Sequence, residues 1–519
     1  MAENKLYRVL EWIFAVILIL VIAVDVVLDN RFYYVCKNNC IVPNIVFLIV
    51  FLMFAVMIYF HGRRKRLKRA DIPQAAPTHF VNIMNVIKVL TVILFVAEVF
   101  YAYEIYFETG WDCKSIVTAS QALCFDGVKI ADAHYFSLYP NNVFLAGIFA
   151  GILKAVYMCG IDAVYFPLII VGCILVSITG YFFADCVRIL TGKKYLIVLF
   201  WILYVALTGL SPWVSIPYSD TYSIFFPTFA IWLFLTKTDK NYVSSWFFIT
   251  FSCFIGYFIK PTVILTLMVL VAFEVLHFFF NLKSYGKKAF LKAVVFVLCI
   301  AVAAVCSLAC RYGVNKATGF TPDETRSVTP VHYFMMGLNE EYGGAYNQGD
   351  VNRSFAYSTV EERNREDMKE AVSRIKGMLP FRIFKFEAQK ALTNFNDGTY
   401  AWGNEGDFYW TYYENDSKSA VFLRSLVYHI GENHDIYVAV TQGFWFVTLC
   451  MAALMILKGR RNRDYRETAI MVVMLAIMSF LMVFEARARY LYLYSPVIYM
   501  VAAMGINRLI VGKDEQEQQ

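Results

Sequence analysis

Residues 10–28 read LEWIFAVILILVIAVDVVL, an unbroken stretch of predominantly apolar side chains. A helix of about 20 residues crosses the roughly 30 Å hydrocarbon core of a bilayer, so this run is long enough to span a membrane. Similar runs recur as far as the C-terminus. Lys5 and Arg8 precede the first run and no small-residue cleavage site follows it, so we expect an uncleaved first span.

The composition of the whole chain supports the same interpretation. Of 519 residues, 59% are hydrophobic and only 17% are charged, and the mean hydropathy is +0.54, which excludes a soluble globular protein. The net charge of +7 is concentrated in short connectors such as 61–69 and 458–463. Basic connectors of this kind are typical of cytoplasmic loops that orient membrane spans, and they do not indicate nucleic-acid binding.

We therefore predict an all-α polytopic membrane protein with about 12 transmembrane helices. With the N-terminus inside, the basic connectors fall on the inner side of the membrane. The predicted spans are 9–28, 42–60, 84–106, 163–188, 195–211, 221–236, 242–259, 261–280, 289–311, 438–457, 468–485 and 490–508.

Residues 144–158 are apolar enough to be counted as a further span. Counting them would place Lys193 and Lys194 outside and would invert every later connector. The segment is short and contains Lys154, which suits a helix lying at the outer interface. We predict that it does not cross the membrane, so that 107–162 forms one long outer segment.

This topology divides the chain into three parts. Residues 1–311 form a transmembrane module with the outer loop 107–162, residues 312–437 form a larger extracytoplasmic loop, and 438–519 supply the last helices and a short cytoplasmic tail. The aromatic stretch 400–413 suits either sugar stacking or a small loop core.

Two pairs of cysteines lie in predicted outer segments, Cys36 with Cys40 and Cys113 with Cys124. A disulfide within either pair requires an oxidising compartment, and free thiols are the alternative.

The first candidate for chemistry is Asp112, which follows the third predicted span and stands beside Trp111. A carboxylate just beyond a span lies where the dielectric constant falls, a setting in which it can act as a general base. A solvated loop acid or a helix cap is the structural alternative. Farther along, the stretch 131–142 is dense in hydrogen-bonding side chains, among them His134, Tyr139 and Asn141, although helix capping by Asn142 explains part of it. His134 has no second histidine at helical spacing, so we do not predict a metal site there.

Three further turns on the same side carry ionisable groups. Asp220 stands at the threshold of a predicted span just after Tyr218, and Lys260 divides two apolar spans. The sequence EARARY at 485–490 places Arg487 and Arg489 between the last two spans, where a hairpin needs only a turn. Guanidinium groups bind phosphate oxygens bidentately, so these cations with Lys260 make an anion site plausible. Taken singly, each cation is explained by snorkelling to lipid headgroups.

The chain resembles the GT-C class of membrane glycosyltransferases, particularly bacterial relatives of the protein O-mannosyltransferases and aminoarabinose transferases. The resemblance is carried by short motifs whose order, sidedness and spacing match the class: Trp111-Asp112, Tyr139-Pro-Asn-Asn142, Pro217-Tyr-Ser-Asp220, Ile259-Lys-Pro261 and Arg487-Ala-Arg-Tyr490. The first loop lacks the adjacent Asp-Glu pair of the eukaryotic protein mannosyltransferases, and 312–437 lacks a WWDYG motif.

The resemblance implies an inverting transfer of a sugar from a polyprenyl-phosphate donor to a glycan, glycolipid or teichoic-acid-like acceptor of the cell envelope. Asp112 would be the catalytic base and Asp220 would assist it, while Lys260, Arg487 and Arg489 would bind the donor phosphate. We expect Trp111, His134, Tyr139, Asn141, Tyr218 and Tyr490 to line the substrate site, on the extracytoplasmic face of a multi-pass protein of the cell membrane. No cofactor is expected, and a divalent cation is left open.

Other classes of function remain as alternatives. A polysaccharide ligase would share the outer cations but use a polymer donor, and a scaffold would tolerate loss of the arginines. A secondary transporter should carry ionisable groups near the middle of the bilayer, for which Glu274 and Asp185 are the candidates.

Overall fold

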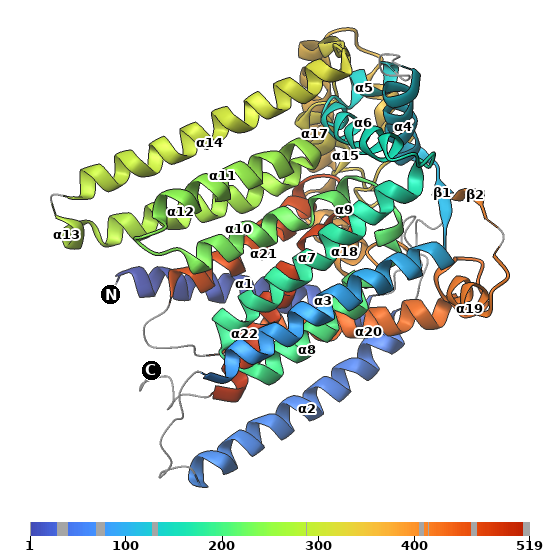
Figure 1. Cartoon of the computed structure of the whole chain (residues 1–519). Coiled ribbons are helices and arrows are strands. Elements are labelled where there is room, and N and C mark those ends of the chain that lie inside the picture. The colour runs from blue at the N-terminus through green and yellow to red at the C-terminus, as the bar shows by residue number, and fades with distance from the viewer. Residues whose placement is uncertain are drawn as a thin grey trace.

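The computed structural model describes residues 2–28, 40–68, 78–126, 133–286, 288–403, 409–413, 415–457 and 464–511. Cys36, the start of the 131–142 stretch, residues 404–408, the connector 458–463 and the tail after 511 lie outside these ranges. Within them the chain is an all-α polytopic membrane protein with one small two-stranded ribbon (Figure 1).

Ten helical segments within the described residues are long and apolar enough to cross a membrane. They are formed by α1 (Ala2–Val27), α2 (Ile41–Lys68), α3 (Thr78–Glu104), α7 (Tyr165–Thr191), α11 (Tyr242–Ile259), α12 (Ile264–Phe280) with the preceding turn η5 (Pro261–Val263), α14 (Lys288–Thr318), α20 (His434–Ala453) with η7 (Leu454–Ile456), α21 (Tyr465–Val483), and η8 (Ala488–Tyr494) with α22 (Ser495–Val511).

Two of the 12 predicted spans correspond to shorter helices. The segment predicted at 195–211 is α8 (Lys194–Tyr204), continued by the π-helical turn η3 (Val205–Gly209). The segment predicted at 221–236 is α9 (Ser219–Ser223) followed by α10 (Phe225–Thr236), which packs against α7 and α11. One face of each helix is buried inside the bundle, whereas Tyr195, Val198, Leu199 and Ile202 of α8 are exposed.

The elements of the two long loops, with the short turn η4, gather at one end of the helix bundle, towards the right-hand side in Figure 1. We call this the loop end. Its elements are β1 (Phe107–Thr109), α4 (Trp111–Gln121), η2 (Ala122–Asp126), α5 (Ala133–Leu138), α6 (Asn142–Met158), η4 (Pro212–Ser215), η6 (Glu324–Arg326), α15 (Pro330–Met336), α16 (Gln348–Ser354), α17 (Val360–Met378), α18 (Arg382–Phe395), β2 (Tyr409–Tyr412) and α19 (Lys418–Val427). The short helix α13 (Leu282–Tyr285) lies at the opposite end.

Helix α6 is the apolar segment that the connector charges excluded from the spans. It packs against α4 and across the ends of α11 and α14, with Phe144 against Phe258 at a centroid distance of 5.5 Å. Gly147 permits this crossing, because a Cβ atom there would lie 2.5 Å from Cγ1 of Val314. The helix is 17 residues long and lies at the loop end; that it does not cross the membrane stays a prediction.

The two long loops are joined to each other and to the bundle. Strand β1 from the first loop pairs antiparallel with β2 from the second, with Phe107 opposite Tyr412. Tyr400 and Trp402 are buried beneath this ribbon, where Trp402 packs against Phe107 and Trp213. These two aromatic residues therefore form a loop core and do not offer their faces to a sugar.

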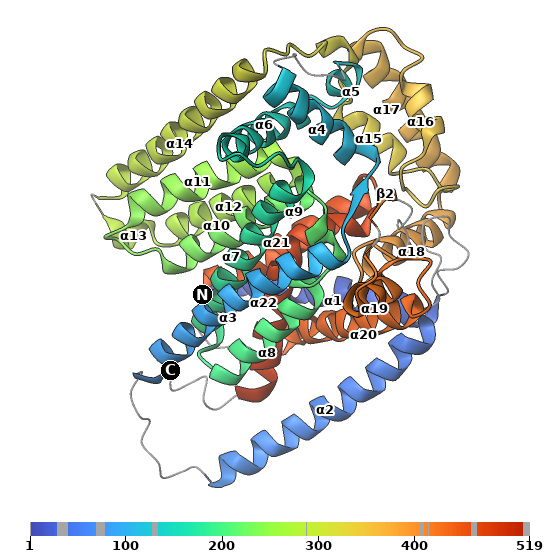
Figure 2. The ribbon, with the colours of Figure 1, turned by 45° about the vertical axis from the view of Figure 1, so that its right-hand side comes forward.

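The second loop also has a small core of its own, formed by residues on and next to α15, α17 and α18, whose ribbons lie on the right-hand side of Figure 2. It consists of Met335, Leu338, Ala371, Met378 and Phe386. We call the described part of residues 320–427 the loop domain; it is the part of the loop end that comes from the second loop.

Candidate functional site

The centre of the candidate site is a buried carboxylate held between two cations. Asp220 lies in the first turn of α9, and its side chain is only 2% exposed. Lys260 Nζ is 2.9 Å from its Oδ1, and Arg489 Nε is 3.3 Å from its Oδ2. Burial lowers the pKa of Lys260, while the charge of Asp220 opposes that shift. Three turns that are distant in sequence thus meet at one ion cluster.

Aromatic rings enclose both cations. The Arg489 guanidinium carbon lies 4.4 Å from the ring centroid of Trp111 and 5.5 Å from that of Tyr218. Lys260 Nζ lies 4.2 Å from the ring centroid of Tyr490. A cation over an aromatic face is attracted by the ring quadrupole, and burial strengthens that attraction. The rings therefore fix the cations in a water-poor environment.

Asp112 borders this cluster and is only half-buried, so a ligand can reach it. It lies in the first turn of α4, and its Oδ2 accepts a hydrogen bond of 2.9 Å from the hydroxyl of Tyr218. Burial, together with the charge of Asp112, raises the pKa of Tyr218 well above its ordinary value, so the phenol stays protonated and donates. Tyr218 therefore links the accessible carboxylate to the buried cations.

The backbone at this position is strained. Trp111 has a φ of 48°, in the left-handed region that bulky residues rarely adopt. Its indole Nε1 donates to Thr109 Oγ1 at 2.8 Å, and its ring meets that of Tyr218 edge-on. Strain of this kind persists where the surroundings over-determine a conformation, and it is concentrated at functional sites.

Asn142 and Tyr135 add a second polar layer beside Asp112. The sequence favoured Asn142 as a helix cap. In the structure Asn142 begins α6, and its amide donates to the hydroxyl of Tyr135 at 2.6 Å and does not cap the helix. Burial and then the charge of Asp112 raise the pKa of Tyr135. Tyr139 packs against Tyr135 at a centroid distance of 5.2 Å, whereas Asn141 donates to Asn142 Oδ1 one position away.

The turn before η8 supplies the most accessible cation of the group. Arg487 has a side chain that is 21% exposed, and its Nε lies 3.8 Å from Oε1 of Glu485. The hydroxyl of Tyr490 donates to the other Glu485 oxygen at 2.9 Å. Glu485 thus holds both the rim arginine and the ring that covers Lys260.

A buried lysine of the loop domain fixes this turn in place. Lys390 Nζ donates to the carbonyl oxygens of Gly337, Met482 and Phe484, each at 2.7 Å. The amide of Ala486 donates to the carbonyl of Gly344 at 2.8 Å. Gly344 has a φ of +76°, and a Cβ there would lie 2.7 Å from the carbonyl of Gly337, so only glycine fits. The position of the arginine turn therefore depends on the loop domain.

Of the cysteines that we considered for disulfides, Cys113 and Cys124 are free thiols. Cys113 is buried, and its thiol donates to the carbonyl of Pro217 at 3.3 Å, which joins α4 to the turn carrying Tyr218 and Asp220. A disulfide between Cys113 and Cys124 is therefore not formed. The pairing of Cys36 with Cys40 lies outside the described residues.

His134 is the predicted site residue that does not join the cluster. It is exposed on α5 and receives a hydrogen bond on Nδ1 from Arg326 at 2.9 Å. Together they line a groove of about 650 Å³ between α5 and the loop domain.

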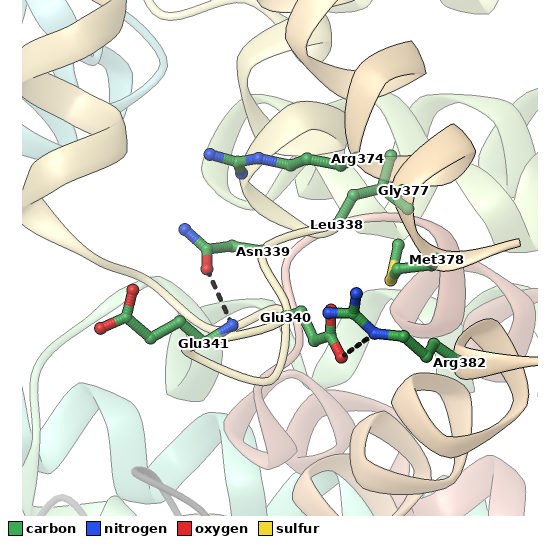
Figure 3. A pocket seen from close by; sticks show the side chains of 8 residues that line it. All are labelled: Leu338, Asn339, Glu340, Glu341, Arg374, Gly377, Met378 and Arg382. Atoms are coloured by element: carbon green, nitrogen blue, oxygen red, sulfur yellow. Dashed lines mark hydrogen bonds and ion pairs between the residues drawn. The ribbon is translucent and has the colours of Figure 1, made fainter.

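A second pocket, of about 460 Å³, lies wholly within the loop domain (Figure 3). Its arginines are paired, Arg382 with Glu340 and Arg374 with Asp350. In Figure 3 the Glu341 carboxylate points away from both arginines. This pocket is held together by its own ion pairs and touches none of the predicted site residues.

The acids considered for transport lie away from the cluster and are paired. Glu274 is paired with Lys237, while Asp185 accepts from Arg188 at 2.6 Å and from Trp232 at 2.8 Å. Sequence analysis missed Glu98, a fully buried acid of α3 that accepts a hydrogen bond of 2.6 Å from Ser177. Its only sequence signal was an acid within an apolar span. Within the described ranges, no group of three or more His, Cys, Asp or Glu side chains is arranged to hold a metal ion.

The helical bundle and its ion cluster define a polytopic integral membrane protein with polar chemistry gathered at one end. A family profile matches residues 3–510, nearly the whole chain. The chain therefore belongs to this family, which is described as conserved hypothetical integral membrane protein. No curated protein and no solved structure matches the chain.

Proposed function

We propose that this protein is a glycosyltransferase of the GT-C type, which moves a sugar from a polyprenyl-phosphate donor to an acceptor hydroxyl of the cell envelope. The observation that carries the proposal is the hydrogen bond from Tyr218 to Asp112, which joins an accessible carboxylate to the buried Asp220–Lys260–Arg489 cluster. A base and a phosphate site must lie side by side for such a transfer.

In this mechanism the acceptor hydroxyl gives its proton to Asp112 while its oxygen attacks C1 of the sugar. The bond between C1 and the phosphate oxygen breaks on the opposite face, and the lipid phosphate leaves with the electron pair. The configuration at C1 is therefore inverted. A general base of this kind contributes about 10²–10⁴-fold to the rate.

The cations stabilise the charge that develops on the departing phosphate. Lys260 and Arg489 share the single negative charge of Asp220, so one positive charge remains for the phosphate, while Arg487, which is paired with Glu485, offers guanidinium N–H groups at the rim. Asp220 is too deeply buried to touch the acceptor, so its part in catalysis is to position the cations. Trp111, Tyr218 and Tyr490 hold those cations, and Tyr139 and Asn141 border the acceptor.

The loop end would face the outside of the cell, as the basic connectors of the sequence predict. A lipid carrier suits that side of the membrane, because nucleotide sugars are confined to the cytoplasm. The acceptor would then be a glycan, a glycolipid or a teichoic-acid-like polymer of the envelope.

The test is transfer of radiolabelled sugar from polyprenyl phosphate by the purified protein in liposomes. Asp112→Asn should lower the transfer rate at least 100-fold while leaving the melting temperature unchanged. Glu341→Gln, which removes an acid from the pocket in Figure 3, is the matched control and should transfer at the wild-type rate. Transfer at the wild-type rate by Asp112→Asn would overturn the proposal. A polysaccharide ligase would not transfer the sugar of the monosaccharide donor. In that case, mass spectrometry of envelope glycans from a deletion strain would identify the polymer that it transfers.

A further inference from the structure

The groove between α5 and the loop domain has the chemistry of a saccharide site. Its lining includes the amides of Gln348 and Asn352 and the half-buried rings of Phe355 and Tyr357. Gln348 Nε2 donates to Asn352 Oδ1 at 3.0 Å, which orients both amides. Amides match the paired hydroxyls of a sugar, and ring faces match its C–H faces.

The histidine in the groove has a defined tautomer. Arg326 can only donate, so the contact with Nδ1 makes that nitrogen an acceptor. The proton of neutral His134 is then on Nε2, which is a donor for a ligand. The exposed charges of Arg326 and Asp323 lie 3.7 Å apart and offset each other, and the third charged residue of the lining, Arg363, is buried and donates to the carbonyls of Ser327 and Thr325. This balance favours a neutral ligand over an anion.

Two sets of residues connect the groove to the candidate active site. Helix α5 presents His134 and Leu138 to the groove and, about 100° around its axis, Tyr135, whose phenol feels the charge of Asp112, as does that of Tyr139 just after the helix. In the second set the hydroxyl of Tyr346 donates to Gln348 Oε1 at 2.8 Å.

Tyr346 in turn lies among the charges of the active site. Burial raises the pKa of its phenol, Asp112 and Glu485 raise it further, and Arg487 lowers it. One phenol therefore touches the groove through Gln348 and lies within electrostatic reach of Asp112.

We propose that this groove binds the saccharide chain of the acceptor, so that its terminal hydroxyl reaches Asp112. The inference rests on the proposed function, and it assigns the acceptor to neutral oligosaccharides or polysaccharides. The pocket in Figure 3 does not serve this purpose, because no aromatic ring lines it and its arginines are paired with carboxylates.

The first experiment measures binding without transfer. The full-length protein in nanodiscs is applied to an array of short neutral and uronic-acid oligosaccharides. The wild type should bind neutral chains, and the double variant Gln348→Ala/Asn352→Ala should bind them about tenfold more weakly, because each lost hydrogen bond weakens the complex. Glu341→Gln in the second pocket should bind as the wild type does, and equal melting temperatures show that all variants fold.

The second experiment measures transfer to the chain that binds best. The double variant should raise the acceptor KM about tenfold and leave the donor KM unchanged. Asp112→Asn should keep wild-type array binding while losing transfer. If the wild type itself binds neutral chains but transfers no sugar to them, the catalytic proposal alone is rejected. Absence of neutral-chain binding by the wild type, or undiminished binding by the double variant, would overturn the groove assignment. Preference for uronic-acid chains would also overturn it.

Discussion

Two buried lysine–carboxylate pairs lie at opposite ends of the bundle. At the loop end Lys260 pairs with Asp220, and at the other end Lys237 pairs with Glu274. Both lysines lie over aromatic rings, with Lys237 Nζ 4.7 Å from the centroid of Phe234. Burial lowers the pKa of both, to about 8 for Lys237. By local chemistry alone the two pairs look alike.

They differ in charge balance and in access. The Lys237–Glu274 pair is one to one, and both side chains are at most 7% exposed. The Asp220 pair has a second cation, Arg489, and Tyr218 connects it to the half-buried Asp112. A closed, balanced pair stabilises the fold, whereas surplus charge beside an accessible base can act on a ligand.

The prediction with the largest expected effect tests whether the Lys237–Glu274 pair stabilises the fold without taking part in transfer. Lys237→Met leaves Glu274 buried without its cation and should lower the free energy of unfolding by about 3–5 kcal/mol. Transfer per folded molecule should stay at the wild-type level. Thermal unfolding in nanodiscs measures the first quantity, and the liposome assay at low temperature measures the second. An unchanged melting temperature with lost transfer would reverse our assignment of the two ends.

Arg489→Lys tests the cation that makes the loop end different. Lysine keeps the charge but loses the planar group that stacks on Trp111 and binds phosphate bidentately. We expect transfer to fall about 100-fold, in the range seen when one donor to a developing anion is removed. Arg382→Lys in the loop domain is the control and should transfer normally. A wild-type rate for Arg489→Lys would show that a point charge is enough.

Tyr218→Phe breaks the link between the accessible acid and the cluster. Loss of a hydrogen bond to a charged group should slow transfer about tenfold. Tyr312→Phe, at a position that is 68% exposed on α14, is the matched control. If both variants transfer equally well, the bond has no part in catalysis.

The smallest effect concerns a third buried lysine, Lys390. Burial lowers its pKa to about 8, against the charge of Glu387, so between about pH 8 and pH 10 the unfolded chain binds more protons than the native one. Its destabilising effect is complete below pH 8 and is relieved as the pH rises. The wild type should therefore gain up to about 1.4 kcal/mol per pH unit relative to Lys390→Met. Equal pH slopes in chemical unfolding would contradict this.

The fold class was predictable because hydropathy and connector charge are local properties of the sequence. The prediction that α6 does not cross the membrane rested on Lys193 and Lys194, together with the short length of the segment and Lys154. The lengths of α8 and α10 were not predictable, because hydropathy marks an apolar stretch but not the residue at which its helix ends or gives way to a turn.

The site was predictable in part. Acids and cations at span ends indicated Asp112, Asp220, Lys260 and the two arginines, and the structure brings them together. Which cation pairs with which acid was not predictable, because that depends on how the separate turns pack against one another. Asn142 looked like a cap because capping depends on neighbouring residues, whereas its bond to Tyr135 depends on how α5 folds back. Lys390 resembled any surface lysine of a charged helix.

The hydrogen bonds from Lys390 to the carbonyls of Met482 and Phe484 have a consequence for how members of this family can diverge. A chimera that receives another loop domain in place of this one loses Lys390 as the anchor of the arginine turn, unless the new domain supplies a lysine at the same place. Replacing the loop domain in order to change the acceptor would therefore displace Arg487 and Arg489, unless the new domain kept Lys390 together with Gly337 and Gly344. The loop and the last two membrane helices are constrained to change together.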